Sequence, residues 1–451
     1  MAHFIKSILI FLTLAFYPLH KGKGQLINYQ IVDESPDHKE KTDSDGMLDN
    51  LGIFTKPAHW ITEGIYWENN RKTWKIGSVG LWSTVPVYNF VDGFWLGQTL
   101  SAIYQENGKE KLRIEPMIYY ATARKAMVWS VDATLQYAPH MKGKMVLSGG
   151  DVAADYDTEE HLARLENSLY SLVLGRNYMK LYRKRFVEVR NNFFPFPGVR
   201  VFGGLSFQWR STEENHTTYS FIHTDYNQSN IPDNKRFRYM PHNKALVGSI
   251  GFDYTLCRLS HMKESTNEII YSEIPTLSAE IDFGIPVGST NQSSFSRINV
   301  SLNQRFKFKR RTTLDYKIGG GAFLTKHNLW FPDFKHFGAY SLPSMRTFTN
   351  DGYFLIGYYN ADTDESWLKG SANFMSEHFL LTRLKFLDNG DFSEGLHARY
   401  LWTSQIRQYH EWGYSIGYKN LFRAGVFVGF KQMKYSNFGF TVSFPWLTGG
   451  Y

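Results

Sequence analysis

Residues 129–137, "WSVDATLQY", alternate between apolar and polar side chains without interruption. Successive side chains of a β-strand point to opposite faces of the sheet, so this strand has one apolar face and one polar face. In a soluble sandwich, the apolar face packs into the protein core and the polar face meets water. In an outer-membrane barrel, the apolar face contacts lipid and the polar face lines the lumen. The alternation predicts a strand and leaves both environments open.

The composition favours the membrane environment. Aromatic residues make up 17% of the 451 residues, with 35 Phe, 28 Tyr and 12 Trp. The mean hydropathy is nevertheless slightly polar, at −0.37. A membrane barrel combines these properties, because it needs an apolar outer surface, rings at both water interfaces and a polar interior.

The N-terminus resembles an export signal. Lys6 precedes the apolar stretch 7–17, Pro18 follows it, and two small residues, Gly22 and Gly24, come before Gln25. This arrangement predicts a signal peptide over residues 1–24, and the apolar stretch is too short to cross a bilayer as a helix. We therefore expect an exported protein in the bacterial outer membrane.

The remainder of the chain excludes several other classes. No later apolar run approaches the roughly 20 residues of a spanning helix, so a membrane protein of this sequence must cross with strands. Cys257 is the only cysteine, which excludes an intramolecular disulfide and a thiol metal cluster. The formal charge of +8 is scattered along the chain, which suits contact with outer-membrane lipids and lipopolysaccharide better than nucleic acid.

These patterns predict that the chain consists of three parts. Residues 1–24 form the signal peptide, residues 25–87 a polar leader with a periplasmic or plug segment, and residues 88–451 the barrel. Period-2 patterns predict about 12 to 16 antiparallel strands in an all-β, closed transmembrane barrel. The strands are expected at 94–105, 112–121, 129–137, 143–152, 179–192, 201–210, 245–256, 277–286, 297–309, 312–324, 353–360, 367–381, 395–403, 412–419, 423–432 and 438–446. The stretch 158–174 is the one good helix candidate.

Rings recur at the ends of the apolar faces, as Trp129 and Tyr137 do. Eight to ten residues tilted by about 40° rise roughly 20–25 Å, which is close to the apolar band of an outer-membrane barrel. A sandwich core has no reason to place rings at this interval. The aromatic girdle candidates are Phe94, Tyr104, Trp129, Tyr137, Trp209, Trp412, Tyr418 and Trp446.

The opposite faces carry small residues together with full charges, which a wet or plugged lumen tolerates. The lumen-lining candidates are Asp132, Arg210, Asp253, Asp282, Arg297, Arg305, Asp315 and Lys317. The last strand, 438–446, ends in rings and resembles the targeting strand that outer-membrane assembly machinery recognises. We therefore expect that machinery to be a partner during insertion.

Four segments resemble motifs of one family, the Bacteroidota outer-membrane barrel domain of unknown function that often follows a carboxypeptidase-like regulatory domain. They are "YWENNRKTW" (66–74), "YNFVDGFWLG" (88–97, with Asp92 in place of Glu), "SNIPDNKRFRYMPHNKALVGSIGFDY" (229–254) and "FLIGYYNADTDESWLKGSANFMSEHFLL" (354–381). The resemblance implies an outer-membrane barrel and supplies no reaction. The regulatory domain is missing here and the first two motifs lie close together, which predicts a compact member.

The remaining chemistry-bearing residues support no catalytic or metal site. Ser376, Glu377 and His378 are adjacent, so their side chains alternate between faces and cannot form a triad. His327, His336, His378, His397 and His410 lack the i, i+2 spacing that a metal site on one strand face requires. We expect no cofactor and no metal.

One loop motif carries a sharper alternative. "LPSMRTF" (342–348) resembles an arginine-containing loop that folds into the lumen of outer-membrane insertases. In that reading, Arg346 pairs with a lumen carboxylate such as Asp282 or Asp315. In the other reading, Arg346 is a solvated loop arginine.

The sequence thus predicts an outer-membrane barrel with a non-enzymatic envelope role in transport, assembly or surface scaffolding. Two alternatives stay open. A barrel-embedded lipid hydrolase would pair His378 with a distant serine on the lipid face. A soluble secreted all-β protein that binds glycans would use the apolar faces as its core. The substrate, the oligomeric state and the exact strand number are not indicated.

Overall fold

The computed structural model describes most of the chain beyond residue 64. The described ranges are 65–69, 71, 73–78, 87–159, 162–221, 229–240, 242–255, 275–287, 291–308, 312–339, 352–377, 379–381, 391–419 and 421–443. The predicted signal peptide, Cys257, Arg346, His378 and Trp446 lie outside these ranges.

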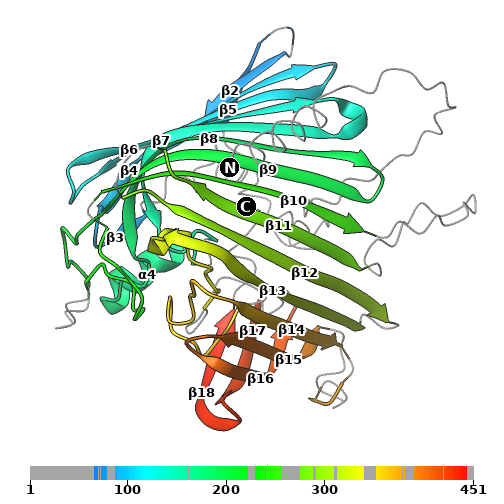
Figure 1. Ribbon diagram of the computed structural model, residues 1–451. Coiled ribbons are helices and arrows are strands. Elements are labelled where there is room, and N and C mark those ends of the chain that lie inside the picture. The colour runs from blue at the N-terminus through cyan, green and yellow to red at the C-terminus, as the bar shows by residue number, and fades with distance from the viewer. Residues whose placement is uncertain are drawn as a thin grey trace, which may run out of the picture. The chain divides into compact units, whose positions relative to one another are not determined.

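The described residues form eighteen strands (Figure 1). They are β1 (Ile65–Glu68), β2 (Trp74–Ser78), β3 (Tyr88–Asn89), β4 (Gly93–Glu106), β5 (Lys109–Ala121), β6 (Ala126–Tyr137), β7 (Gly143–Asp155), β8 (Leu181–Phe196), β9 (Val199–Thr212), β10 (Asn243–Thr255), β11 (Thr276–Ile285), β12 (Ser294–Phe308), β13 (Thr312–Asn328), β14 (Trp367–Ser376), β15 (Phe392–Thr403), β16 (Arg407–Tyr418), β17 (Phe422–Lys431) and β18 (Lys434–Ser443).

Neighbouring strands pair antiparallel in chain order. β1 pairs with β2, β2 and β3 each pair with β4, and from β4 onward every strand pairs with the next as far as β18. Within the described part of the chain, no residue register joins β18 to β1. The predicted all-β antiparallel architecture is therefore confirmed, whereas closure of the sheet stays a prediction.

Two details of the strand prediction need correction. The sheet has eighteen strands instead of about 12 to 16, partly because β1 and β2 join it from the stretch expected to precede the barrel. The predicted strand at 353–360 is wrong. Tyr353, Phe354 and Ile356 are buried in an irregular connection between β13 and β14, and a short apolar run of this kind cannot be distinguished from a buried strand by periodicity.

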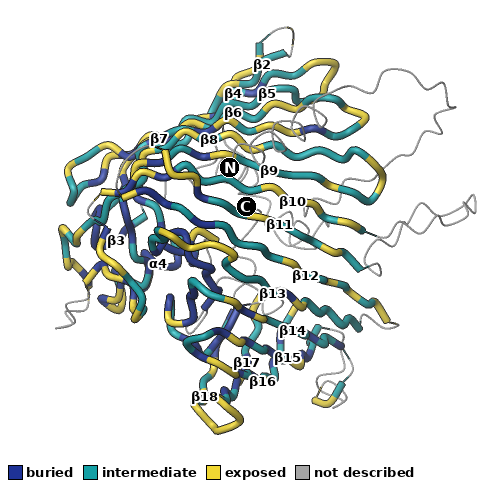
Figure 2. Tube along the Cα trace, viewed as in Figure 1, coloured by how far each residue is buried: buried dark blue, intermediate teal, exposed yellow. Residues whose placement is uncertain are grey.

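The two faces of the sheet differ in burial (Figure 2). On β6, Trp129, Val131 and Leu135 are 45%, 37% and 38% exposed, whereas Ser130 between them is buried. The same alternation recurs along the sheet: large apolar side chains on one face are exposed, including Leu147, Val187, Leu205, Ile250, Ile281, Ile318, Leu368, Leu396, Trp412, Val426 and Phe440. We call this surface the apolar face.

The longest connections leave from one end of the sheet. Residues 156–180, 213–242 and 329–366 link β7 to β8, β9 to β10 and β13 to β14, and antiparallel order places all three at the same end, which we call the mouth. β18 ends at the opposite end. Tight turns serve other strand pairs, as between β4 and β5, where Asn107 and Gly108 both have positive φ (52° and 73°).

Helix α4 (Arg164–Leu174) lies in the connection between β7 and β8, within the predicted helical stretch 158–174. Gly175 ends it in the left-handed conformation, with φ 62°. Among the described residues, no helix is long and apolar enough to span a membrane.

Candidate functional site

The described parts of the connection between β13 and β14, residues 329–339 and 352–366, lie at the mouth and contact β7, β9 and β16. The first of these parts contains a 3-10 turn, η4 (Phe331–Asp333), and every residue from 331 to 339 is buried. Phe331 packs against Tyr156 and Tyr359, and Tyr182 packs against Tyr156 in the same aromatic cluster. This burial is unusual for a connection, because connections ordinarily run over the surface. Residues 331–339 are therefore an interior element of this connection.

A buried ion pair fixes this connection to the sheet. Arg210 Nη1 on β9 lies 2.6 Å from Asp333 Oδ1, and the two side chains are 3% and 2% exposed. The Ser293 hydroxyl donates to Asp333 Oδ2 at 2.6 Å. Charges this deeply buried persist only when paired and fully hydrogen-bonded. Arg210 was a predicted lumen residue, but its partner lies in a connection and could not be identified from strand periodicity.

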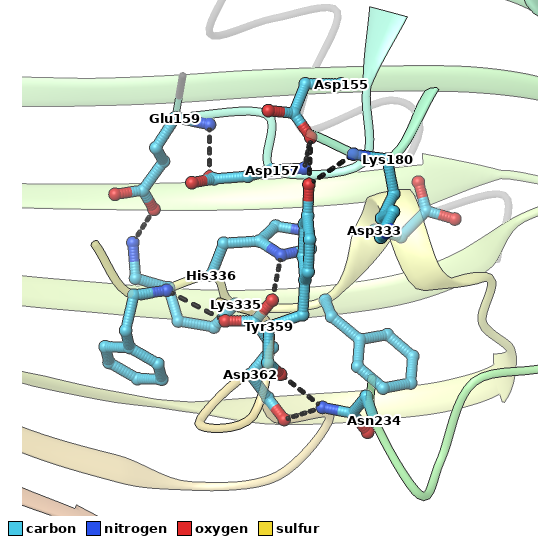
Figure 3. Close-up of polar contacts among 12 residues, drawn as sticks. Asp155, Asp157, Glu159, Lys180, Asn234, Asp333, Lys335, His336, Tyr359 and Asp362 are labelled. Atoms are coloured by element: carbon cyan, nitrogen blue, oxygen red, sulfur yellow. Dashed lines mark hydrogen bonds and ion pairs between the residues drawn. The ribbon is translucent and has the colours of Figure 1, made fainter. Parts of the chain in front are cut away.

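A second set of contacts joins this connection to the one between β7 and β8 (Figure 3). The Tyr359 hydroxyl donates to Asp155 Oδ1 at 2.8 Å and accepts the Lys180 backbone N–H at 2.8 Å. Burial and the neighbouring carboxylate of Asp155 raise the pKa of Tyr359 well above its usual value. Burial lowers the pKa of Lys180 to about 8, against the attraction of Asp155 and Asp233.

A histidine–carboxylate pair holds the same connection together. His336 Nδ1 lies 2.6 Å from Asp362 Oδ2, and Asp362 Oδ1 accepts the Phe337 backbone N–H at 3.0 Å. Burial opposes protonation of His336, but the attraction of Asp362 outweighs it and raises the pKa of His336. Asn234, from the connection between β9 and β10, donates to the backbone carbonyls of Tyr359 and Asp362.

This pair predicts a pH dependence of the mouth. A pKa raised by folding contributes stability below the unfolded pKa and loses it as the pH rises through the folded value. We expect hydrogen exchange of residues 352–366 to accelerate as the pH rises above about 6.5, beyond the intrinsic chemical increase. The lowered pKa of Lys180 acts in the opposite direction, from about pH 8 upward. The His336→Gln variant should show a smaller acceleration than the wild type over this rise in pH; an equal acceleration in both would contradict the assignment.

A glutamate anchors the second described part of the connection, residues 352–366. Glu411 on β16 is 0% exposed and accepts the backbone N–H groups of Phe354 and Leu355 at 2.9 and 2.8 Å. The Tyr409 hydroxyl donates to the same carboxylate at 2.6 Å, and Arg399 Nε donates to the Gly352 carbonyl at 3.2 Å. Glu411 and Arg399 were not among the residues predicted from the sequence, although both are isolated charges among aromatic residues on strands.

The other predicted lumen residues lie on the face opposite the apolar face, mostly as cross-strand ion pairs. Asp132 accepts the Ser148 hydroxyl. Arg297 pairs with Asp282 at 2.7 Å, Arg305 with Asp315 at 2.6 Å, and Asp253 with Arg200 at 2.7 Å. Lys317 lies opposite Asn303 and Ser371. Asp282 and Asp315, the partners suggested for Arg346, are thus engaged by other arginines.

The described aromatic girdle candidates differ in exposure and in position along their strands. Trp129 and Trp209 are both about half exposed and share one row across the sheet, because Trp129 opposes Asp151, Asp151 opposes Arg185, and Arg185 opposes Trp209. Trp412, 60% exposed, lies at mid-strand opposite Ala398 and Val428. The less exposed rings are Phe94, Tyr104, Tyr137 and Tyr418.

One arrangement has the connectivity of a catalytic triad. His397 on β15 bonds through Nδ1 to Asn373 Oδ1 and through Nε2 to Ser415 Oγ, each at 2.8 Å. The three side chains face away from the apolar face, and each residue is at most 2% exposed. Arg423 Nη1 donates to the same Ser415 oxygen at 3.0 Å. Burial and this donation withhold the hydroxyl from an acyl substrate, so the arrangement acts as a hydrogen-bonded link between three strands.

Comparisons with known proteins identify the family of this chain. The comparison with curated proteins finds no match. Among solved structures, BamA from Haemophilus ducreyi lacking POTRA domains 1–3 aligns with a TM-score of 0.42 at 9% identity, over 79% of this chain and 68% of that chain. Wzi, an outer-membrane carbohydrate-binding β-barrel involved in group 1 capsule assembly in Escherichia coli, aligns with a TM-score of 0.37 at 8% identity, over 83% and 74%.

TM-scores this low do not establish a relationship between this chain and either protein. The family comparison does, because a model matches residues 58–416, most of the chain and nearly all of the described strands. The chain belongs to the C-terminal domain family of DUF5686, a family of unknown function.

Proposed function

We propose that this protein is an outer-membrane β-barrel that is shut at rest by residues 329–339 and 352–366 of the connection between β13 and β14, and that it has a non-enzymatic envelope role in gated transport or assembly. The observation that carries the proposal is the apolar face. In water, side chains such as Phe440 (74% exposed), Trp412 (60%) and Val187 (56%) would form an apolar surface far larger than the few hundred Å² that soluble monomers tolerate. Against acyl chains, the same surface is favourable.

Closure of the sheet follows from the same environment. Unpaired backbone groups at the margins of β1 and β18 would each cost several kcal/mol in hydrocarbon, which is why spanning sheets close on themselves. The orientation follows from the connections. Outer-membrane barrels have short periplasmic turns and longer extracellular loops, so the mouth faces the outside and the end of β18 faces the periplasm.

The filled mouth supports a gated role over open diffusion. The 329–366 connection is held by a buried ion pair to β9, by Tyr359 to Asp155, and by Glu411 on β16. Anything that passes through the mouth must displace these contacts.

Fractionation tests the proposal. The protein should sediment with the outer membrane, resist extraction by high salt and alkali, and migrate faster on gels before boiling than after it. A periplasmic or secreted protein that needs no detergent would contradict the membrane assignment and favour a soluble all-β protein.

The lipid hydrolase is the second candidate, because Ser415, His397 and Asn373 do form a relay. Its burial leads us to expect that Ser415→Ala leaves phospholipid and lipopolysaccharide turnover by the purified protein at the wild-type background. His397→Ala should instead lower thermal stability, since it removes two buried hydrogen bonds, at about 1 kcal/mol each. Turnover that exceeds background and disappears in Ser415→Ala would overturn this interpretation.

A further inference from the structure

A row of charged and aromatic side chains crosses the apolar face near the mouth. Arg185 on β8 opposes Trp209 on β9, and Trp209 opposes Lys244 on β10. Arg183 lies one step nearer the mouth on β8. These side chains border a hollow of about 420 Å³, lined also by His242 and Asn291. The hollow opens on the surface that the proposed function assigns to lipid.

The charge of this hollow is positive. Asp151 is the carboxylate in the row, and it accepts Arg183 Nε and Nη2 at 2.9 and 2.7 Å and Arg185 Nε at 2.9 Å. Glu213 also attracts Arg183. Arg185 is 56% exposed, with its remaining guanidinium nitrogens unpaired among the described residues, and Lys244 has no carboxylate partner there. Two cationic groups are thus available to an anion.

The rows of side chains directly below this one, farther from the mouth, are apolar. Val187 and Phe207 form the next row on β8 and β9, and Val189 and Leu205 form the one after it. Val187, Val189 and Leu205 are 56%, 39% and 41% exposed. A ligand that fits this sequence of rows has an anionic head at Arg185 and Lys244 and apolar chains along the strands below. Trp209 lies at the boundary, where amphipathic rings prefer to be.

We propose that Arg183, Arg185, Trp209 and Lys244 form a binding site for the phosphate group of a phosphorylated lipid in the outer leaflet. Guanidinium and ammonium groups bind phosphate through charge-assisted hydrogen bonds, and the fixed fork of arginine suits phosphate oxygens. The continuous apolar column below the cations selects a lipid over free phosphate. This inference rests on the proposed membrane orientation.

Lipid binding by the full chain in nanodiscs tests the site, with lipid A as the probe and native mass spectrometry as the readout. The Arg185→Ala/Lys244→Ala variant should bind lipid A at least roughly tenfold more weakly, since it removes both cationic groups that are available to the phosphate. Lys431→Ala/Lys434→Ala is the matched control, because it removes two exposed charges from the same end of the sheet outside the hollow. It should bind like the wild type.

Two further measurements distinguish a phosphorylated lipid from free phosphate as the ligand. Wild-type protein should bind lipid A without its phosphates as weakly as the Arg185→Ala/Lys244→Ala variant binds intact lipid A, and inorganic phosphate should not compete. Three results would contradict the lipid site: an equal loss of lipid A affinity in both double variants, equal affinity for lipid A with and without its phosphates, or competition by inorganic phosphate. If the protein is not retained in nanodiscs, the proposed function fails with it; if it is retained and only the phosphate dependence is missing, the site alone fails.

Discussion

Asp333→Ala should release the 329–366 connection and open the mouth. The substitution leaves the Arg210 guanidinium buried without its carboxylate, which typically costs about 3–5 kcal/mol. Most of that cost can be relieved by moving the connection away from β9, so its opening equilibrium should rise by roughly 100-fold. Conductance in planar bilayers and trypsin cleavage within 329–366 should both increase.

Arg305→Ala is the matched control for this prediction. Arg305 and Asp315 also form an arginine–aspartate ion pair at 2.6 Å, but the arginine is 53% exposed and the pair joins β12 to β13 away from the mouth. Exposed pairs contribute about 0–1 kcal/mol, so this variant should stay closed. Equal conductance of the two variants and the wild type would show that the ion pair does not hold the mouth.

Ala133→Arg should block membrane insertion far more than Asp132→Asn. Ala133 lies on the apolar face at the middle of β6, opposite Ile114 and Leu147. An arginine on the lipid face near the bilayer midplane costs about 2–4 kcal/mol. Asp132 lies on the other face and contacts Ser148, so asparagine can keep that hydrogen bond and should change stability by at most about 0.5 kcal/mol.

The yield of heat-modifiable protein in the outer membrane measures both variants. Lys144 on β7 faces away from the apolar face and is exposed, and Lys144→Ala provides a charge change that should not affect assembly. Equal yields of Ala133→Arg and Asp132→Asn would reverse the assignment of the two faces.

The sequence predicted strands better than it predicted connections. Alternation over 129–137, 201–210 and 297–309 reflects burial on one side of each strand, and the structure places β6, β9 and β12 there. Such a pattern is local, since each side chain's face follows from its position alone. The short strands β1 and β2 carry too few residues for a period-2 pattern to emerge.

The filled mouth could not be predicted in this way. Arg210 was identified as a polar-face charge, but its partner Asp333 lies 123 positions away in an irregular segment. Contacts such as Tyr359 with Asp155, or Glu411 with Phe354, depend on how three connections fold together, and no periodicity encodes that. The expected partners of Arg346 illustrate the same limit, because Asp282 and Asp315 pair with the arginines directly across the sheet.

Accessibility along residues 129–137 tests the central claim most directly. In a Cys257→Ser background, a spin label would be placed at each position in turn, and its collisions with oxygen and with a water-soluble nickel complex would be measured in lipid vesicles. We predict oxygen accessibility that peaks at Trp129, Val131, Ala133 and Leu135 and falls at the intervening positions, with the nickel complex showing the opposite phase. Nickel accessibility highest at Val131 and Ala133, or no alternation at all, would contradict a lipid-facing apolar surface.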